Sequence, residues 1–369
     1  MLATRYPSWR LLLNSLYLVL LSWSINAFAT ATSLTIKDSA PKTYTVVKGD
    51  TLWDISALYL DSPWLWPRLW QANPDINNPH LIYPGDQLTL IWRDGQPVLS
   101  RKPMLRLSPQ ARVTARQPLP IVEQHLILPY LVADRLMTPT ELDSSLKIIG
   151  SQQGNQYLSQ QDSLYIAGQH EASHWAIYRP MNSFVTEQQT MIGLRLLATA
   201  HQVDSSSTLT TLAIDQFNQE IRANDIALPE ITLDSLNLTT HFLPTPAPAG
   251  LHSRLLGTLE GSQYAAKHHV VVIEHGQQAG LVQGSMFELY QAGHTVYQTG
   301  DQFSDTPRRS SQAIQLPAKK VGELMVIRPY PNMSLALITT SQVAIDEQIS
   351  IVAPHSSDTS VEQRIALNP

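Results

Sequence analysis

The 369-residue chain contains no cysteine. A chain without cysteine forms no disulfide, carries no lipid on a cysteine and has no thiolate nucleophile. Charged residues make up only 15% of it, and its formal net charge is −5. Because surfaces that hold nucleic acid or acidic lipid are usually strongly basic, we expect neither as a partner.

Several catalytic motifs are also missing. The sequence has no G-x-S-x-G elbow, no P-loop and no dinucleotide-binding glycine fingerprint. We therefore predict no cofactor and no enzymatic activity. Hydroxyls, histidines and carboxylates are scattered along the chain, so a catalytic triad assembled in space remains the alternative.

Residues 1–29 have the pattern of a secretory signal. Arg5 and Arg10 supply the positive start, residues 11–21 are apolar, and Ala27-Phe28-Ala29 offers a small-residue cleavage site. We expect export to the periplasm or cell envelope. The apolar run is short for a membrane span, and an uncleaved membrane anchor is the alternative.

The stretch from Thr43 to Trp92 has the clearest local pattern. Residues 43–47 are β-branched or aromatic and stop at Lys48-Gly49-Asp50, which predicts a strand and a tight turn. A helix should begin next, with either Thr51 or Asp50 capping its first amides.

Two helices and a closing strand are predicted after this turn. A second helix over residues 65–72 should end at Asn73-Pro74. Residues 84–86 then predict a turn, and alternating apolar residues over 88–92 predict a strand. In the first helix, the residues at spacings of three and four that predict one buried face are Leu52, Ile55, Leu58 and Tyr59.

Strand, helix, helix and strand in this order resemble a LysM domain, the small module that binds N-acetylglucosamine chains of peptidoglycan and chitin. Two separated segments carry the resemblance: Tyr44–Ser56 (YTVVKGDTLWDIS) and Asn77–Asp86 (NNPHLIYPGD). The resemblance implies a bacterial exported protein whose partner is peptidoglycan. It also implies a glycan-binding groove formed by Gly49, Asp50, Thr51, Leu52, Ile76, Leu81 and Ile82.

These groove residues also have a purely structural interpretation. Leu52 and Ile82 are apolar enough to be core residues, and Asp50 is a suitable helix cap. The tryptophans at 64, 66 and 70 offer flat faces for stacking on sugar rings. The helical spacing of Trp66 and Trp70 favours core packing over stacking.

Residues His170-Glu171-Ala172-Ser173-His174 match H-E-x-x-H, the zinc peptidase motif. That chemistry requires both histidines on one face of a helix. Short strands are predicted on both sides, ending before Gly168 and resuming at Trp175, which favours a hairpin loop and no metal site. The pair His268-His269 and His275 flank an apolar run over 270–273, so we interpret them as strand ends.

The remainder contains a weak internal repeat of short β-prone segments. In the first copy they are 162–166, 193–198, 211–214 and 224–226; in the second they are 284–289, 322–327, 334–338 and 347–349. Such spacing predicts two small antiparallel barrels or sandwiches. Thr138-Pro139-Thr140-Glu141 also has the spacing of a capping box and predicts a short helical turn.

The predicted fold is α+β multidomain, with a βααβ module followed by two mainly antiparallel β modules. The second β module weakly resembles the SH3-like barrels of flagellar assembly proteins, and a protein partner is expected there if the modules bind anything. The alternative function is a cell-wall hydrolase or zinc peptidase targeted by the LysM segment, with its chemistry in residues 125–353. The predicted parts are a signal (1–29), tether (30–42), LysM domain (43–92), linker (93–124), first β module (125–229), proline-containing linker (230–252), second β module (253–353) and flexible tail (354–369).

Overall fold

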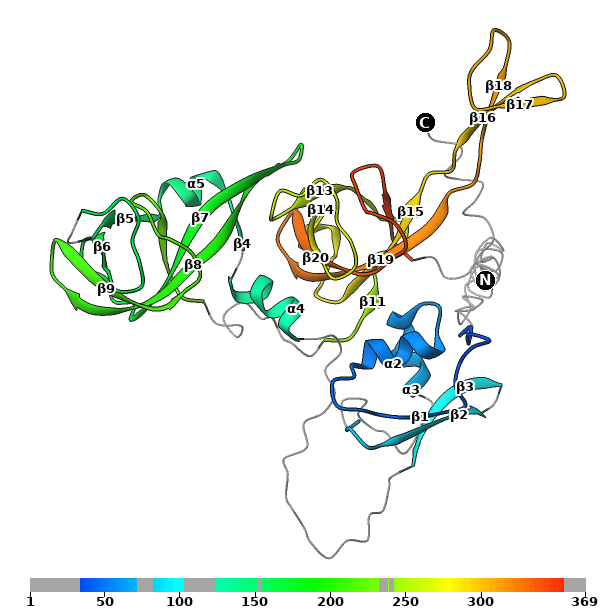
Figure 1. The fold of residues 1–369 in the computed structure, drawn as a ribbon, viewed down its shortest axis with the longest axis horizontal. Helices are drawn as coiled ribbons and strands as arrows, with labels where there is room; N and C mark the ends of the chain where they lie inside the picture. Colours follow the sequence, from blue (N-terminus) through cyan, green and yellow to red (C-terminus); the bar gives the residue numbers. More distant parts are fainter. Residues whose placement is uncertain are drawn as a thin grey trace, which may run out of the picture. The chain divides into compact units, whose positions relative to one another are not determined.

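The computed structural model describes residues 34–71, 82–93, 95–102, 124–133, 135–151, 154–231, 238 and 242–354 (Figure 1). The predicted signal, Ile76, Leu81 and the predicted tail from residue 355 onward lie outside these ranges. Strands make up more of the described chain than helices do. Within it, no helix is both long and apolar enough to cross a membrane.

The first part of the described chain combines short helices with a three-stranded antiparallel sheet (Figure 1). The central strand β2 pairs with β1 on one side and β3 on the other. The predicted order of strand, helix, helix and strand is confirmed. The elements are β1 (Thr43–Thr45), α2 (Leu52–Tyr59), the 3-10 helix η1 (Pro63–Leu65), α3 (Trp66–Gln71), β2 (Gln87–Arg93) and β3 (Gln96–Lys102).

The buried face of α2 differs in one position from the predicted one. Leu58, predicted to face the core, is 40% exposed. Ser56 is buried in its place, because its hydroxyl donates to the Leu52 carbonyl at 2.7 Å and so needs no water. The spacing of apolar residues alone does not predict the burial of a polar side chain such as Ser56, which hydrogen-bonds to the preceding helical turn.

Both segments flanking this part are more ordered than the sequence suggests. Residues 96–102, assigned to a linker, form β3 along the whole length of β2. In the segment assigned to a tether, Ile36 bridges Leu60, and the Lys37 amide donates to the Tyr59 carbonyl at 2.9 Å. Backbone pairing, which composition does not reveal, attaches both segments to the sheet and to α2.

The middle of the chain forms a sheet that closes on itself. Strand β8 pairs with β7 and with β9, and the ring continues through β10, β5 and β6. Strand β4 adds to the outer side of β8, and α5 begins with the predicted capping box between Thr138 and Glu141. The elements are α4 (Gln124–Leu128), the π-helix η3 (Pro129–Ala133), β4 (Arg135–Met137), α5 (Pro139–Asp143), β5 (Leu146–Gly150), β6 (Ser163–Ala167), β7 (His174–Val185), β8 (Thr190–Ser205), β9 (Leu209–Phe217) and β10 (Ile226–Pro229).

The last part forms a second closed sheet. Only Arg254 separates β12, which pairs with β21, from β13, which pairs with β14, so one continuous segment joins the two ends of the sheet. The elements are β11 (Thr245–Pro246), β12 (His252–Ser253), β13 (Leu255–Thr258), β14 (Val270–Glu274), the 3-10 helix η5 (Gln277–Ala279), β15 (Ser285–Gln291), β19 (Lys319–Pro329), β20 (Met333–Ser341) and β21 (Ser350–Val352).

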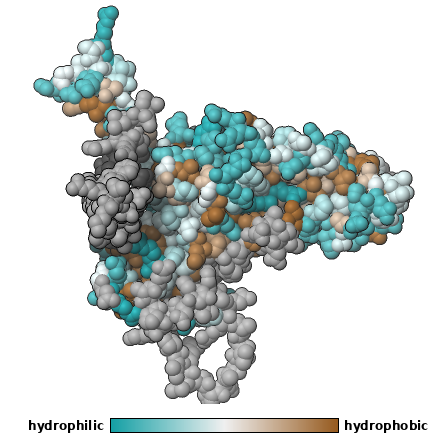
Figure 2. Space-filling model, turned by 180° about the vertical axis from the view of Figure 1, so that it is seen from behind, coloured by the Kyte–Doolittle hydropathy of each residue, from teal (hydrophilic) through white to brown (hydrophobic). Residues whose placement is uncertain are grey.

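A small separate sheet is inserted between β15 and β19. It consists of β16 (Thr295–Thr299), β17 (Gln302–Ser304) and β18 (Gln312–Gln315), with β16 in the centre. None of its residues is fully buried, and Phe303 is 65% exposed. On the face drawn in Figure 2, apolar surface is visible on this sheet among polar residues. This sheet therefore has no hydrophobic core of its own.

The two closed sheets have the same topology. In both, the six corresponding pairings are antiparallel and follow the same circular order. The internal repeat is therefore present in the fold. The corresponding strands are β5 with β12 and β13, β6 with β14, β7 with β15, β8 with β19, β9 with β20, and β10 with β21.

One of the four repeat equivalences drawn from the sequence is wrong. Residues 162–166 were matched to 284–289, but these segments form β6 and β15, which are not corresponding strands. The pairs 193–198 with 322–327 and 211–214 with 334–338 do fall on corresponding strands. All these segments are short and apolar, so only hydrogen-bonded neighbours distinguish one strand from the next.

Isolated bridges lie at corresponding places in the two copies. Leu158 pairs with Ile221 in the first closed sheet, and Ala265 pairs with Ile345 in the second. The bridges join the loops that precede β6 and β10 in the first sheet, and those that precede β14 and β21 in the second. This correspondence extends the repeat from the strands to the loops.

Residues 242–252, assigned to a proline-containing linker, belong to the second closed sheet. The Thr245 amide donates to the Gly284 carbonyl at 3.0 Å, and the Ala247 amide donates to Met286 at 3.0 Å. The two closed sheets also bond to each other, since the Asn182 amide group donates to the Leu259 carbonyl at 3.1 Å. The expected exposed joint between two independent modules is therefore wrong for these residues.

A partly buried ion pair joins β7 to the residue just before β10 in the first closed sheet. Arg179 on β7 donates from Nε and Nη2 to the two carboxylate oxygens of Asp225, at 3.0 and 2.7 Å. Asp225 also accepts the Arg222 amide at 2.7 Å. Hydrogen bonding to Asp225 raises the pKa of Arg179 above its usual range, so the pair stays charged.

We predict that Asp225→Ala lowers the free energy of unfolding by about 2–3 kcal/mol. Fully buried pairs cost about 3–5 kcal/mol to break, and the partial exposure of Arg179 reduces that figure. Urea unfolding followed by circular dichroism measures the change. Asp215→Ala is the control, because Asp215 forms an exposed pair with His201 and should cost less than about 1 kcal/mol. Equal losses for both variants would contradict the prediction.

Candidate functional site

The turn between β1 and α2, together with the first residue of α2, contains four of the seven residues predicted to bind a ligand. Gly49 is exposed and has a φ of 103°, a conformation that glycine adopts without strain. The Asp50 carboxylate accepts the Val47 amide at 2.8 Å and the Tyr44 hydroxyl at 3.0 Å. Asp50 therefore closes the turn, and these bonds fix its side chain before any ligand arrives.

Thr51, and not Asp50, caps α2. Its hydroxyl oxygen accepts the Asp54 amide at 3.0 Å and donates to the Asp54 carboxylate at 2.6 Å. The acidic side chain in the first helical turn also complements the positive end of the helix dipole. The sequence allowed either Asp50 or Thr51 to cap the helix, and the hydrogen bond to the Asp54 amide shows that Thr51 is the cap.

Two tyrosine hydroxyls lie near this turn and stay protonated at neutral pH. Burial raises the pKa of Tyr44, and the neighbouring Asp50 carboxylate raises it further. Burial likewise raises the pKa of Tyr59 to about 12, with a smaller contribution from Tyr44. Both groups are therefore neutral at neutral pH, and the Tyr44 hydroxyl donates to Asp50.

The second predicted wall of the site begins beside the same turn. The Val46 amide donates to the Asp86 carbonyl at 2.9 Å, and the Gly85 amide donates to the Val46 carbonyl at 2.8 Å. These bonds place the turn at Pro84–Asp86 against the end of β1, with Ile82 immediately before it. Ile76 and Leu81 belong to the same predicted wall but lie outside the described residues.

Leu52 and Ile82 are core residues. Both are fully buried in one hydrophobic cluster. A ligand at this place would meet the exposed Gly49, but neither Leu52 nor Ile82 has surface for it to touch. The structural interpretation of these two side chains, left open by the sequence, is confirmed.

The tryptophans divide into core and surface residues. Trp66 and Trp70 are fully buried, which confirms core packing and leaves no face free for a sugar. Trp64 is partly buried against the same cluster. The sequence missed Trp92 on β2, whose side chain is 65% exposed and offers a flat apolar surface. It also gave no role to Trp53, which is buried.

Residues 170–173 of the H-E-x-x-H segment form a loop, as predicted, and His174 begins β7, so the segment is not a helix. His170 bonds through Nε2 to the Ala167 carbonyl at 2.7 Å, and His174 bonds through Nδ1 to the Ser173 hydroxyl at 3.0 Å. The strands on either side are not paired with each other, so the predicted hairpin is wrong. Two histidines held this way do not share a helical face, which the zinc peptidase geometry requires.

The second histidine cluster lies at the ends of β14, as predicted. His268 and His269 are exposed before the strand, and His275 is half-buried after it. Over the described ranges, no group of three or more histidine, aspartate or glutamate side chains is arranged to hold a metal ion.

Comparison with known proteins finds one matching family model. The LysM domain model matches residues 44–90, the part that contains the turn and both helices. The Bacillus subtilis (strain 168) protein named "Uncharacterized protein YqbP" is 40% identical over 62 residues. That match covers 14% of this chain and 28% of YqbP, so the chain spans less than a third of this relative's length. The likeness is confined to one segment.

We predict that Thr51→Ala destabilises α2 by about 1 kcal/mol, because the Asp54 amide loses its acceptor. Thr51→Ser keeps the hydroxyl and is the matched control, with a smaller loss. Hydrogen exchange of the first amides of α2 measures the effect. Equal exchange rates in the alanine and serine variants would show that Thr51 is not the cap.

Proposed function

We propose that the chain, which contains a LysM domain at residues 44–90, is an exported and non-catalytic bacterial protein that binds the N-acetylglucosamine-containing glycan of peptidoglycan. LysM domains bind glycans of the peptidoglycan and chitin type. The match of that model to a folded strand–helix–helix–strand unit is the observation that carries the proposal.

The chemistry of the turn between β1 and α2 supports a neutral ligand. An acetamido group needs a backbone donor, a backbone acceptor and a small apolar surface for its methyl group. The exposed backbone at Gly49 offers such groups, and no side chain would lie within 4 Å of a Cβ placed there. Asp50 is already engaged by Val47 and Tyr44, so recognition does not depend on its charge.

Export is the second half of the proposal and rests on the sequence. The basic start, apolar run and small-residue cleavage site of residues 1–29 direct a chain out of the cytoplasm. A chain without cysteine needs no oxidising or reducing enzyme in the periplasm. We place the protein in the periplasm or cell envelope, where its proposed ligand is found.

We predict weak, salt-insensitive binding to short glycans. A groove that makes a few neutral hydrogen bonds, each worth about 0.5–1.5 kcal/mol, should give dissociation constants from about millimolar to micromolar. Few ion pairs are available for salt to screen. Titration of the full chain with an N-acetylglucosamine oligomer at low and moderate salt measures both properties.

The matched ligand control is a glucose oligomer of equal length, which lacks the acetamido groups and should not bind. If raising the salt weakens binding by tens of fold, charge holds the ligand. If the glucose oligomer binds equally well, the acetamido group is not what is recognised. Either result would contradict the proposed recognition.

We also predict that Glu171→Gln changes nothing in assays of wall cleavage. His170 and His174 have other partners and no shared helical face, so Glu171 has no metal-bound water to activate. Zymography on peptidoglycan and metal analysis of the purified chain test this. Stoichiometric zinc, together with a cleavage activity that is lost in Glu171→Gln, would establish the alternative function of a targeted peptidase.

A further inference from the structure

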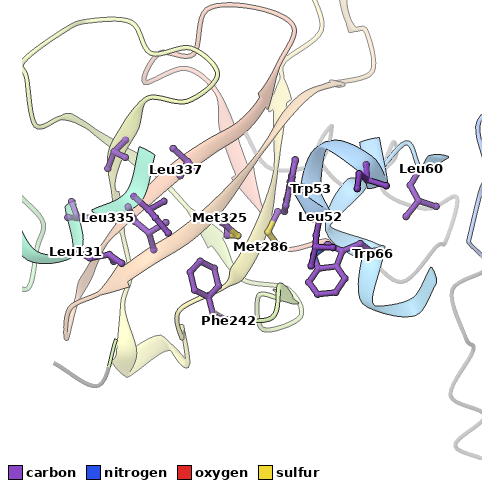
Figure 3. Close-up of a cluster of buried hydrophobic side chains, with 14 of the residues drawn as sticks. Leu52, Trp53, Leu60, Trp66, Leu131, Phe242, Met286, Met325, Leu335 and Leu337 are labelled. Carbon is purple, nitrogen blue, oxygen red and sulfur yellow. The ribbon is translucent and has the colours of Figure 1, made fainter. Parts of the chain in front are cut away.

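The helix α2 packs against the second closed sheet. Leu52 and Trp53 belong to one hydrophobic cluster that also contains Met286 on β15, Met325 on β19 and Leu337 on β20. Figure 3 shows Trp53 and Leu52 on the helix beside Met286 and the strand that carries it. Trp53 lies beside the apolar stripe of α2 and is nevertheless only 5% exposed. Its burial is consistent with coverage by this sheet.

A polar contact lies at the edge of this apolar one. Lys320 on β19 donates to the Ser62 hydroxyl at 3.3 Å, and it donates to Glu288 and Glu323 at 2.7 Å each. Burial lowers the pKa of Lys320, but the charges of Glu323 and Glu288 more than offset this and raise it. Lys320 is therefore a cation that bonds the second closed sheet to the residue just before η1.

Glu323 takes part in the same polar edge. It is almost fully buried, and its Oε1 accepts from Lys320. Burial raises the pKa of this carboxyl, and Lys320 and a hydrogen bond from Ser62 oppose the shift. Charged groups held away from water are costly to bury, and Lys320 and Glu323 would regain water if the two surfaces separated. The contact thus combines an apolar centre with a charged edge that water can solvate.

The contact leaves little room beside Thr51. A cavity of about 20 Å³ lies between Thr51, Trp53 and Asp54 on one side and His268, Leu337 and Thr339 on the other. A cavity holds one water molecule from about 10–15 Å³ upward, so this one is far too small for a sugar ring. Thr51, one of the residues predicted to bind glycan, is only 2% exposed. Gly49, at the other end of the same turn, remains exposed.

We propose that this contact is an intramolecular cover: the second closed sheet shuts the Thr51 end of the glycan-binding turn, and full binding requires α2 to separate from it. This inference rests on the proposed function of the LysM domain. A ligand that binds only the open form has an apparent affinity reduced by the open fraction. If about a tenth of the molecules are open, full release raises the apparent affinity about tenfold.

A reversible cross-link tests the cover directly. The chain has no cysteine, so Ser62→Cys combined with Lys320→Cys creates the only two thiols in the full chain. A short bifunctional thiol reagent that a reductant cleaves would lock the segment between α2 and η1 to β19. We expect the locked chain to bind an N-acetylglucosamine oligomer at least about tenfold more weakly than the same chain after reduction. Ser62→Cys alone, treated identically, should show no such change.

A further full-length variant tests the opposite change without a cross-linker. Lys320→Ala removes the cation that bonds Ser62 and should strengthen glycan binding several-fold. The control Lys319→Ala removes an exposed lysine from the same strand and should not change it. Circular dichroism confirms that each variant is folded.

The outcomes separate the cover from the proposed function. If the locked and reduced chains bind the oligomer equally well, the cover is refuted and glycan binding by the LysM domain stands. If no form of the chain, locked, reduced or substituted, binds the oligomer, the proposed function fails, and the cover fails with it.

Discussion

The hydrophobic cluster that continues from the LysM helices into the second closed sheet is the interaction on which the structure most depends. It contains Trp66 and Trp70 at one end and Leu335 and Met333 at the other. Burying each large apolar side chain contributes roughly 1.5–3 kcal/mol relative to exposure, so a cluster of this size outweighs any single polar contact. It stabilises the LysM domain, and in the arrangement described it also covers part of that domain's surface.

The two closed sheets reach one topology with different interiors. The first is built around Trp175, Leu164 and Ile177, and the second around Phe287, Val271 and Ile338. The ion pair of Arg179 and Asp225 belongs to the first, while the cluster around Lys320 belongs to the second. The repeat therefore explains the shared scaffold, and the local differences explain why only the second sheet carries the polar contact to Ser62.

Local features were predictable from the sequence. The Thr138 capping box, the start of α2 at Leu52 and the loop at His170 all follow from spacings within a few residues. Contacts between residues far apart in the sequence could not be predicted in this way. Arg179 and Asp225 lie 46 residues apart, and Lys320 and Ser62 lie 258 residues apart. The spacing of apolar residues in α2 does not predict that Trp53 is buried. Of the predicted site, Gly49 to Thr51 lie on one turn and Leu52 begins α2, but whether glycan touches them stays a prediction.

Amide hydrogen exchange of the full chain, with and without an N-acetylglucosamine oligomer, tests the central claim most directly. Glycan bound at the LysM domain should slow exchange in the turn around Gly49 to Leu52 and in the segment that ends at Ile82. The strands of the first closed sheet should exchange as before. Protection confined to residues 135–229, with no change near Gly49, would contradict the account.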